Sequence, residues 1–410
     1  MNPLPSRNIL MCVSGMSPAV ITETLYALVT QDAPFIPDEI HVVTTLTGKD
    51  KILKDLLAPQ TGHFHRLVAD YLPGRAIRFD ASTVHVISQE SPTAPALTMN
   101  HPFGGLMRDP AQPQHLLLHS TELADIQTIE DNDAAANTIY REMRKLKAQP
   151  GTRLHASVAG GRKSMSFYMG HAFSLLADMG DSLSHVLVSE PFENGQLHFY
   201  YPPRTAKTLS YLDRARQPQE VCTADAHIEL AELSVLRLGG FLGQDWPEKA
   251  KDSLSFAVQL AQAALGTPQI KVVLNHQGDN ACGWLEVCGE TVTLPPLQFA
   301  VFALYAIACK HQDELPEGAA LNLDTLTDAF WSDLFEVWGH RFSAGSDFKA
   351  TLSKIREQLR QSVGPVEKHF QIVAIRSREM HGQKMLQAAP AQLELVNLAA
   401  WWKALRHELM

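Results

Sequence analysis

Two short turns of the chain carry residue types that bind phosphate groups. The first is Ser14–Pro18, which follows an apolar run at 8–13, and the second is Gly160–Ser164, which follows an apolar run at 153–159. Glycines allow a ligand to approach the backbone, serine hydroxyls hydrogen-bond phosphate or ribose, and arginine and lysine offset phosphate charge. A helical pattern follows each turn, and helix N-termini favour anions. Together the turns predict a cradle for sugar and phosphate groups.

The spacing within these turns argues against several common nucleotide and hydrolase sites. Neither turn matches the G-x-G-x-x-G fingerprint of nicotinamide dinucleotide sites or the G-x-x-x-x-G-K-[ST] loop of nucleoside triphosphate sites. The sequence therefore does not favour either kind of site. Ala19 stands where a nucleophile elbow needs its second glycine, and Pro18 follows Ser17, which argues against an esterase. A third turn, with Thr45, Thr47 and Lys49, follows the apolar run at 39–45 and is a further candidate for ligand contact.

The elements around these turns alternate between strand and helix patterns. Such alternation predicts an α/β domain with a Rossmann-like, mostly parallel sheet and helices on both faces. Ligands of such sheets bind beyond the carboxyl ends of the strands, so both turns should meet at one edge. The amino-acid sequence at 72–119 is typical of a loop that crosses the sheet. The segment HFYYPP at 198–203 predicts one arm of a β-hairpin. Strands are expected at 8–13, 39–45, 83–87, 153–159 and 185–190, and helices at 19–29, 47–57, 131–147 and 165–180.

The second half of the chain has a different pattern. A charged, turn-rich stretch at 204–222 suggests a linker, and we expect domains at 1–205 and 246–410 joined by a linker and connecting helix at 206–245. Three helices closed by a β-hairpin predict an α+β winged helix-turn-helix domain. The expected elements are a helix at 246–265, strands at 270–275 and 283–293, an apolar helix in LQFAVFALYAIACK, helices near 323–337 and 345–362, and a hairpin from FQIVAI and KMLQA.

Four segments of the first half resemble the CARF (CRISPR-associated Rossmann fold) domain of a CRISPR-associated ring nuclease family. They are VSGMSPAVITETLYAL, DIQTIEDNDAAANTIYREM, SVAGGRKSMSFYMGHAFSLL and HVLVSEPFENGQLHFYYPP, within about residues 8–205. The resemblance implies that two copies pair about a two-fold axis and hold a cyclic oligoadenylate, first of all cyclic tetra-adenylate, across the interface. It also implies cleavage without metal or cofactor, in which a ribose 2′-OH attacks the adjacent phosphorus and leaves a 2′,3′-cyclic phosphate.

The resemblance assigns roles to individual residues. The family's lysine matches Lys163, and its hydroxyl residue matches Ser17 or, less directly, Ser14. Arg162 stands where many relatives have a small polar residue, which implies stronger phosphate binding or a different ring size. An alternative role for Lys163 is to neutralise a carboxylate at the start of a helix. The remaining expected ligand contacts are Gly15, Met16, Pro18, Thr45, Thr47, Gly160, Gly161 and Ser164.

Two other functions remain open. EVCGETVTLPPLQFAVFALYA and DFKATLSKIREQLRQ resemble the winged-helix domain of response-regulator-type transcription factors, which implies a ligand-controlled regulator that binds DNA. A domain of this kind can equally strengthen a dimer or cover the ligand. Arg376 and His381 have the spacing of a HEPN ribonuclease, although they interrupt an alternating strand pair where HEPN needs a helix. The candidate recognition helix at 346–361 offers Lys349, Lys354, Arg356 and Arg360 to DNA phosphates.

Composition narrows the class of protein further. The chain has 410 residues, is 45% apolar and 19% charged, and has a net charge of −9, which argues against a broad basic surface for nucleic acid. No apolar run reaches the ~18 residues that span a bilayer, and no signal-peptide pattern precedes the first strand, so we expect a cytoplasmic protein with no membrane partner. The five cysteines form no C-x-x-C pair.

The sequence offers no clear metal site. The 18 histidines include no H-E-x-x-H spacing, so we expect His41, His85 and His155 to be packing or surface residues. The carboxylates Glu130, Asp131 and Asp133 precede an apolar helix, where a capping role is favoured over an acidic site.

Overall fold

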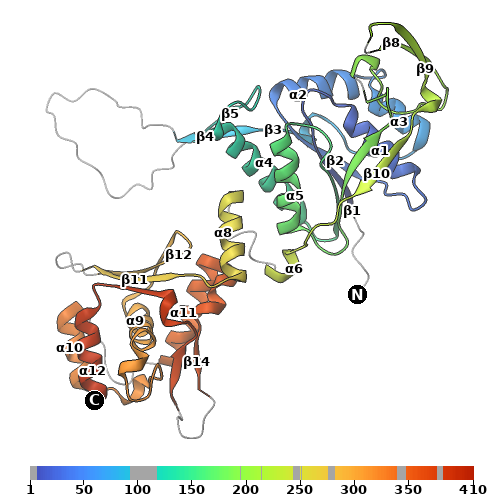
Figure 1. Ribbon diagram of the computed structural model, residues 1–410. Coiled ribbons are helices and arrows are strands. Elements are labelled where there is room, and N and C mark those ends of the chain that lie inside the picture. Colours follow the sequence, from blue (N-terminus) through green and yellow to red (C-terminus); the bar gives the residue numbers. More distant parts are fainter. Residues whose placement is uncertain are drawn as a thin grey trace, which may run out of the picture. The chain divides into compact units, whose positions relative to one another are not determined.

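The computed structural model describes residues 7–92, 118–193, 195–213, 215–242, 250, 252–275, 282–338, 348–375 and 382–410 (Figure 1). The chain divides into two compact units. The first runs to Gly240 and includes Asp252–Leu254, and the second comprises Phe241–Lys251 and Ser255–Met410. We describe each unit by itself.

The first unit is built on a six-stranded sheet with the strand order β10-β7-β6-β1-β2-β3. All neighbouring pairs are parallel except β10 and β7, which are antiparallel. The prediction of a mostly parallel α/β sheet is therefore confirmed. The strands are β1 (Arg7–Val13), β2 (Glu39–Thr44), β3 (Val84–Val86), β6 (Thr152–Ser157), β7 (Ser182–Val188) and β10 (Ile228–Glu232).

Helices cover both faces of this sheet, which explains why Ile9–Val13 of the central strand β1 is an unbroken apolar run. Leu10 and Cys12 of β1 pack with α1 and α3 in one core, whereas α4 and α5 pack together and against the opposite face (Figure 1). The helices are α1 (Ala19–Thr30), α2 (Leu46–Lys51) with a π-helical continuation at Ile52–Leu56, α3 (His63–Tyr71), α4 (Ile129–Lys147) and α5 (Lys163–Leu176).

The expected loop at 72–119 contains ordered elements at both of its ends. β4 (Ser88–Pro92) and β5 (Leu118–Glu122) pair antiparallel as a two-stranded ribbon. A short 3-10 helix at Ala81–Thr83 precedes β3, which lies where a strand was predicted. Residues 93–117, the centre of the expected loop, lie outside the described residues.

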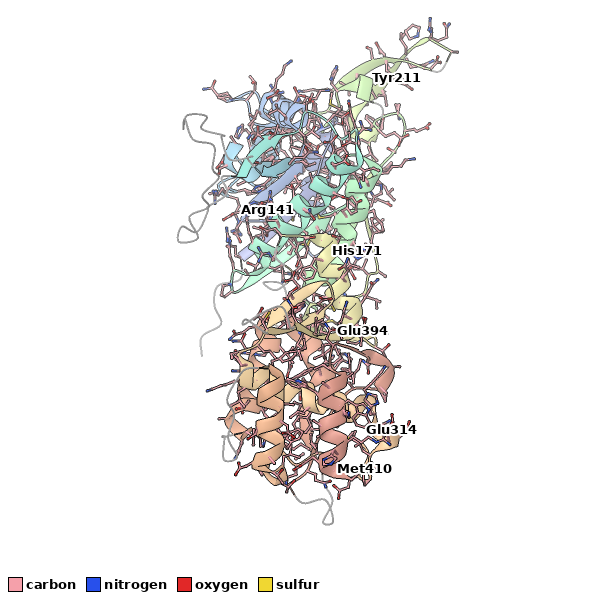
Figure 2. All side chains as sticks on the ribbon, turned by 90° about the vertical axis from the view of Figure 1, so that its left-hand side faces the viewer. Arg141, His171, Tyr211, Glu314, Glu394 and Met410 are labelled. Atoms are coloured by element: carbon pink, nitrogen blue, oxygen red, sulfur yellow. The ribbon has the colours of Figure 1, made fainter. Side chains whose placement is uncertain are left out.

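The predicted linker and domain boundary differ from the structure. Residues 204–222 contain a β-hairpin of β8 (Thr208–Leu212) and β9 (Pro218–Cys222), which carries Tyr211 away from the sheet (Figure 2). β10 then hydrogen-bonds β7, so the first unit extends to Gly240 rather than to 205. The expected arm at 198–203 is not a strand. Its Tyr200 and Tyr201 are instead buried in the core of the first unit. The charged residues that gave this stretch the composition of a linker lie before β8 and in the turn between the strands, among them Arg204, Lys207, Asp213 and Arg216.

The second unit combines a four-stranded sheet with helices. Its order is β13-β12-β11-β16, antiparallel except for the parallel pair β11 and β16. The predicted mixture of helices and strands is observed, and β16 with the last helix was not predicted. The strands are β11 (Ile270–Asn275), β12 (Cys282–Val287), β13 (Glu290–Thr293) and β16 (Leu393–Val396), with a separate pair β14 (Ile372–Ala374) and β15 (Lys384–Leu386).

One apolar helix, α9, forms the centre of the second unit. Every residue of α9 from Phe299 to Cys309 is buried, which explains why its sequence is apolar all round. No helix in the described ranges is long and apolar enough to cross a membrane. The helices are α6 (Gly239–Leu242) at the boundary, α8 (Leu254–Leu265), α9 (Pro296–Lys310), α10 (Asp328–Trp338), α11 (Phe348–Val363) and α12 (Ala399–Leu409).

Candidate functional site

The two predicted turns, Ser14–Pro18 and Gly160–Ser164, meet at the carboxyl edge of the first sheet, which we call the loop edge. β1 and β6 are adjacent and parallel, with Cys12 opposite Ser157, so the loops that follow them start side by side. A Cβ built on Gly15 would lie 3.2 Å from the Cα of Gly161. The contact is therefore between backbones. Gly161, with φ +72°, also has a left-handed conformation that side chains disfavour, which accounts for glycine there.

The helices that leave these loops begin without side-chain caps. Neither α1 nor α5 has a capping hydrogen bond or an acidic residue in its first turn. α4 differs, because Thr128 and Asp131 form a capping box, and the N–H groups of Gln127 and Thr128 lower the pKa of Asp131. The predicted capping role of Asp131 is thus confirmed. The starts of α1 and α5 leave N–H groups and positive dipole ends for an anion.

The two candidate serines occupy different environments. Ser14 is fully buried, and its Oγ donates to the carbonyl oxygen of Ser17 at 3.4 Å. Its amide donates to the carbonyl oxygen of Val43 at 3.1 Å, which ties the loop to β2. Ser17 is exposed at the loop surface. Ser14 therefore supports the turn from within, and the side chain of Ser17 is the one that a ligand can reach.

Lys163 is the first residue of α5 and is exposed. Within the described part of the chain, no carboxylate lies at ion-pair distance from its ammonium group. The alternative role, neutralisation of a carboxylate at a helix start, finds no partner there. Arg162, by contrast, is bound: its Nε donates to Asp125 Oδ1 at 3.0 Å, and a terminal nitrogen pairs with Asp125 Oδ2.

The third turn reaches the same edge through its backbone. A Cβ built on Gly48 would lie 2.9 Å from the carbonyl oxygen of Gly15. Thr45 is buried and caps α2 by accepting from the Gly48 amide at 3.3 Å, and the Thr47 hydroxyl donates to the Ala124 carbonyl at 2.9 Å. The hydroxyls of Thr45 and Thr47 thus have partners within the protein. The sequence patterns did not predict the close approach of Gly48 to Gly15.

Apolar side chains are exposed beside these loops. Met16, at the tip of the first loop, is 56% exposed, and Phe167, one turn into α5, is 63% exposed. Phe167 lies four residues after Lys163, on the same face of α5. The sequence patterns missed Phe167 because an apolar residue at helical spacing predicts core packing. Pro18 is buried as the residue before α1, and Ser164 is half-buried in the first turn of α5.

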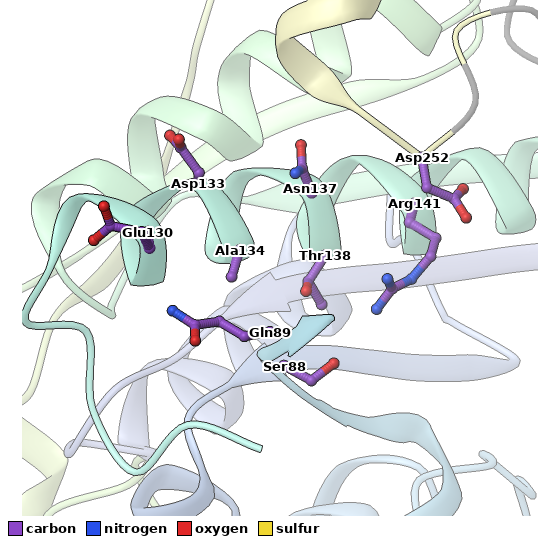
Figure 3. Close-up of a pocket in the computed structure, with 9 residues that line it drawn as sticks. All are labelled: Ser88, Gln89, Glu130, Asp133, Ala134, Asn137, Thr138, Arg141 and Asp252. Carbon is purple, nitrogen blue, oxygen red and sulfur yellow. The ribbon is translucent and has the colours of Figure 1, made fainter. Parts of the chain in front are cut away.

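A cavity of about 510 Å³ lies elsewhere in the first unit, between α4 and β4 (Figure 3). Asn137 and Thr138 lie along its α4 wall, above Ser88 of β4. Glu130, Asp133 and Asp252 line it, and Arg141 is the one cation among the described lining residues. It contains none of the predicted ligand residues, and its acidic lining disfavours a polyphosphate.

The histidines singled out from the sequence lie away from the loop edge. His41 Nδ1 is 3.0 Å from His85 Nε2, and the outer nitrogens of the pair face Glu39 at 3.1 Å and Glu142 at 3.5 Å. Burial lowers the pKa of His85 to about 4. His155 Nε2 lies 2.7 Å from Ser184 Oγ between neighbouring strands. All three are packing residues, and within the described ranges no group of three His, Cys, Asp or Glu side chains could hold a metal ion.

The cations predicted to contact DNA lie on α11. Lys349 and Lys354 are exposed, as is Arg356, but Arg356 Nε donates to Glu367 at 2.7 Å. Glu357 likewise pairs with Arg360 at 3.2 Å. Two of the four cations therefore already have carboxylate partners. Arg376 and His381, the pair with ribonuclease spacing, lie outside the described residues.

The fold and the loop edge define a doubly wound α/β protein with a candidate anion-binding site at the carboxyl ends of its strands. The family model described as CRISPR-associated protein NE0113 (Cas_NE0113) matches residues 17–95 and 108–264. Because this match covers more than half of the chain, the chain belongs to that family of CRISPR-associated proteins. No curated protein matches the chain.

Proposed function

We propose that this protein is a ring nuclease that binds and cleaves a cyclic oligoadenylate, with cyclic tetra-adenylate as the first candidate. The observation that carries the proposal is the backbone contact of Gly15 with Gly161, which brings the loops of Ser17 and Lys163 to one edge. Membership of a CRISPR-associated family agrees with a substrate that acts as an antiviral signal. The cleavage would end that signal.

The loop edge has groups for each part of an oligoadenylate. Phosphates would lie against the uncapped starts of α1 and α5 and against Lys163. Ribose and phosphate oxygens would hydrogen-bond the Ser17 hydroxyl. Met16 and Phe167 expose apolar surface on which adenine would pack, since bases stack on aromatic side chains.

Cleavage would follow from positioning and electrostatics. In the proposed step the ribose 2′-oxygen forms a bond to the adjacent phosphorus while the bond from phosphorus to the 5′-oxygen breaks. The 2′-OH proton is lost, and the leaving 5′-oxygen gains a proton, which leaves a 2′,3′-cyclic phosphate and a 5′-OH. Lys163 would stabilise charge on the phosphoryl oxygens, and Ser17 would orient them. Ser14, being buried, would support the loop.

The active form would be a homodimer. A cyclic tetra-adenylate with repeated nucleotides has rotational symmetry, and a two-fold pair of identical sites matches it. Two copies of the loop edge would then present two lysines and two serines to one ring. Each site would use the same residues on opposite sides of the ligand.

The direct test is incubation of the purified protein with cyclic tetra-adenylate in EDTA, followed by chromatography of the products. Linear products that end in a 2′,3′-cyclic phosphate would support a metal-independent ring nuclease. Unchanged ligand that remains tightly bound would refute cleavage and favour a ligand sensor. Absence of both binding and cleavage, with cyclic hexa-adenylate also tested, would refute the proposal.

A second candidate function is a ligand-controlled DNA-binding regulator of the winged-helix type. The order of elements in the second unit, sheet, α9, α10, α11 and the β14–β15 pair, favours it. The pairing of Arg356 with Glu367 reduces the charge available to DNA and argues for a role in dimer stability or ligand enclosure. Binding of duplex DNA that weakens with salt and with Lys349→Ala or Lys354→Ala would support the regulator.

A further inference from the structure

The guanidinium of Arg162, which a ligand phosphate would be expected to bind, already forms an ion pair with Asp125. Asp125 lies in the segment between β5 and α4, far from Arg162 in the sequence, and binds the guanidinium through both carboxylate oxygens. The partners are both partly exposed, with 53% and 44% of their side-chain surfaces accessible. The pair therefore lies at the surface of the loop edge, where a ligand phosphate would arrive.

The segment that carries Asp125 is fixed to the neighbouring loops. The Leu46 amide donates to the Leu123 carbonyl at 2.8 Å, and the Thr47 hydroxyl donates to the Ala124 carbonyl at 2.9 Å. The Leu123 amide in turn donates to the Ile87 carbonyl at 2.8 Å. Asp125 is thus presented to Arg162 by a segment that three hydrogen bonds hold in place. The short Asp125 side chain is therefore presented from backbone that these hydrogen bonds fix.

We propose that Asp125 is a positioning residue that competes with a ligand phosphate for Arg162, and so limits how tightly the site holds substrate and product. The inference rests on the proposed function. A guanidinium binds carboxylate and phosphate through the same fork of parallel N–H groups, so one anion displaces the other from that edge. In the free protein Arg162 is held by Asp125. On binding, the phosphate takes the guanidinium, and Asp125 returns to it when the product leaves.

The proposal gives the neighbouring cations Arg162 and Lys163 different roles. Lys163 has no partner within the described residues and would face the phosphate permanently. Arg162 would exchange partners, so its contribution to affinity would be reduced by the strength of the pair with Asp125. A site with both cations free would bind an anionic product more tightly and release it more slowly. The alternative is that Asp125 orients Arg162 so that its other edge binds the ligand.

These alternatives predict opposite effects of Asp125→Asn on the dissociation constant for cyclic tetra-adenylate. Competition predicts binding about fivefold tighter, the upper range for release of an exposed ion pair. The KM for cleavage should fall in parallel, while the single-turnover rate of the cleavage step at saturating protein stays the same. In an Arg162→Ala background, Asp125→Asn should have no further effect. Glu130→Gln is the matched control, because it removes one negative charge from the start of α4 without a contact to Arg162.

Calorimetry on the 410-residue chain, with melting curves for each variant, distinguishes the outcomes. Tighter binding in Asp125→Asn but not in Glu130→Gln supports competition. Equal or weaker binding in Asp125→Asn, or equal tightening in both variants, overturns it. If the wild-type protein binds no cyclic oligoadenylate, the proposed function fails first and this inference fails with it. If the wild type binds and Asp125→Asn does not bind more tightly, the inference alone fails.

Discussion

Gly160 packs directly against Val20: a Cβ built on Gly160 would lie 2.8 Å from Val20 Cγ2 and 3.0 Å from the Val13 carbonyl oxygen. Gly160 also has a φ of +103°, which side chains rarely adopt. We therefore expect Gly160→Ala to destabilise the first unit by about 2 kcal/mol, through backbone strain and displacement of the β1 loop. Thermal denaturation would measure this loss, and weaker ligand binding should accompany it.

Gly180 provides the matched control for this substitution. It lies in the same unit, between α5 and β7, and a Cβ built there would have no atom within 4 Å. Gly180→Ala should leave both the melting temperature and ligand binding near the wild-type values. If Gly160→Ala is as stable as Gly180→Ala, the close contact of the two loops is wrong.

Lys163→Ala should lower the cleavage rate by about 10²- to 10³-fold, with a smaller loss of binding. The reason is that a cation aimed at developing phosphoryl charge stabilises the transition state more than the bound substrate. Single-turnover cleavage and equilibrium binding of cyclic tetra-adenylate separate the two effects. Lys207→Ala, at an exposed position before β8, is the control. Full cleavage activity in Lys163→Ala would remove Lys163 from the proposed site.

The two serines of the first loop should give different phenotypes. Ser17→Ala should slow cleavage and leave the melting temperature unchanged, because the Ser17 side chain is exposed. Ser14→Ala should instead lower the stability by about 1 kcal/mol, since it removes the part-buried hydrogen bond from the Ser14 hydroxyl to the Ser17 carbonyl. Melting curves and single-turnover rates of both variants test the assignment. A slow but fully stable Ser14→Ala variant would reverse it.

The sequence was sufficient to predict where the loops meet, because that position follows from local patterns. The apolar runs at 8–13 and 153–159 lead into the turns of Gly15 and Gly160, and in a parallel sheet both turns lie at the same edge. That β1 and β6 are neighbours in the sheet did not follow from the sequence. The capture of Arg162 by Asp125 was not predictable, because it depends on the tertiary path of the segment after β5. Composition was misleading around the β8–β9 hairpin, because the charged residues of its turn and of the segment before β8 are typical of a linker, whereas the two strands carry one charged residue, Glu220.

The buried carboxyl of Glu23 on α1 should make the stability of the first unit depend on pH. Glu23 is 6% exposed, and desolvation raises its pKa from 4.5 to about 7. The folded state therefore keeps a proton that the unfolded chain releases near its lower pKa. The resulting stabilisation is fully present below the unfolded value and is lost as the pH rises through about 7. No sequence pattern indicates this burial, because a glutamate in a helix is usually exposed.

Glu23→Gln removes this titration while retaining the shape of the side chain. The variant should gain stability relative to the wild type as the pH rises from 5 to 8, by up to about 3 kcal/mol, the equivalent of the shift in pKa. Denaturation midpoints of the two proteins across this range measure the difference. Glu229→Gln, at an exposed position on β10, is the control and should show no such trend. A constant difference between wild type and Glu23→Gln would mean that Glu23 is ionised in the folded protein. It would then need a cationic or hydrogen-bonding partner, because an unpaired charge at that depth is too costly to persist.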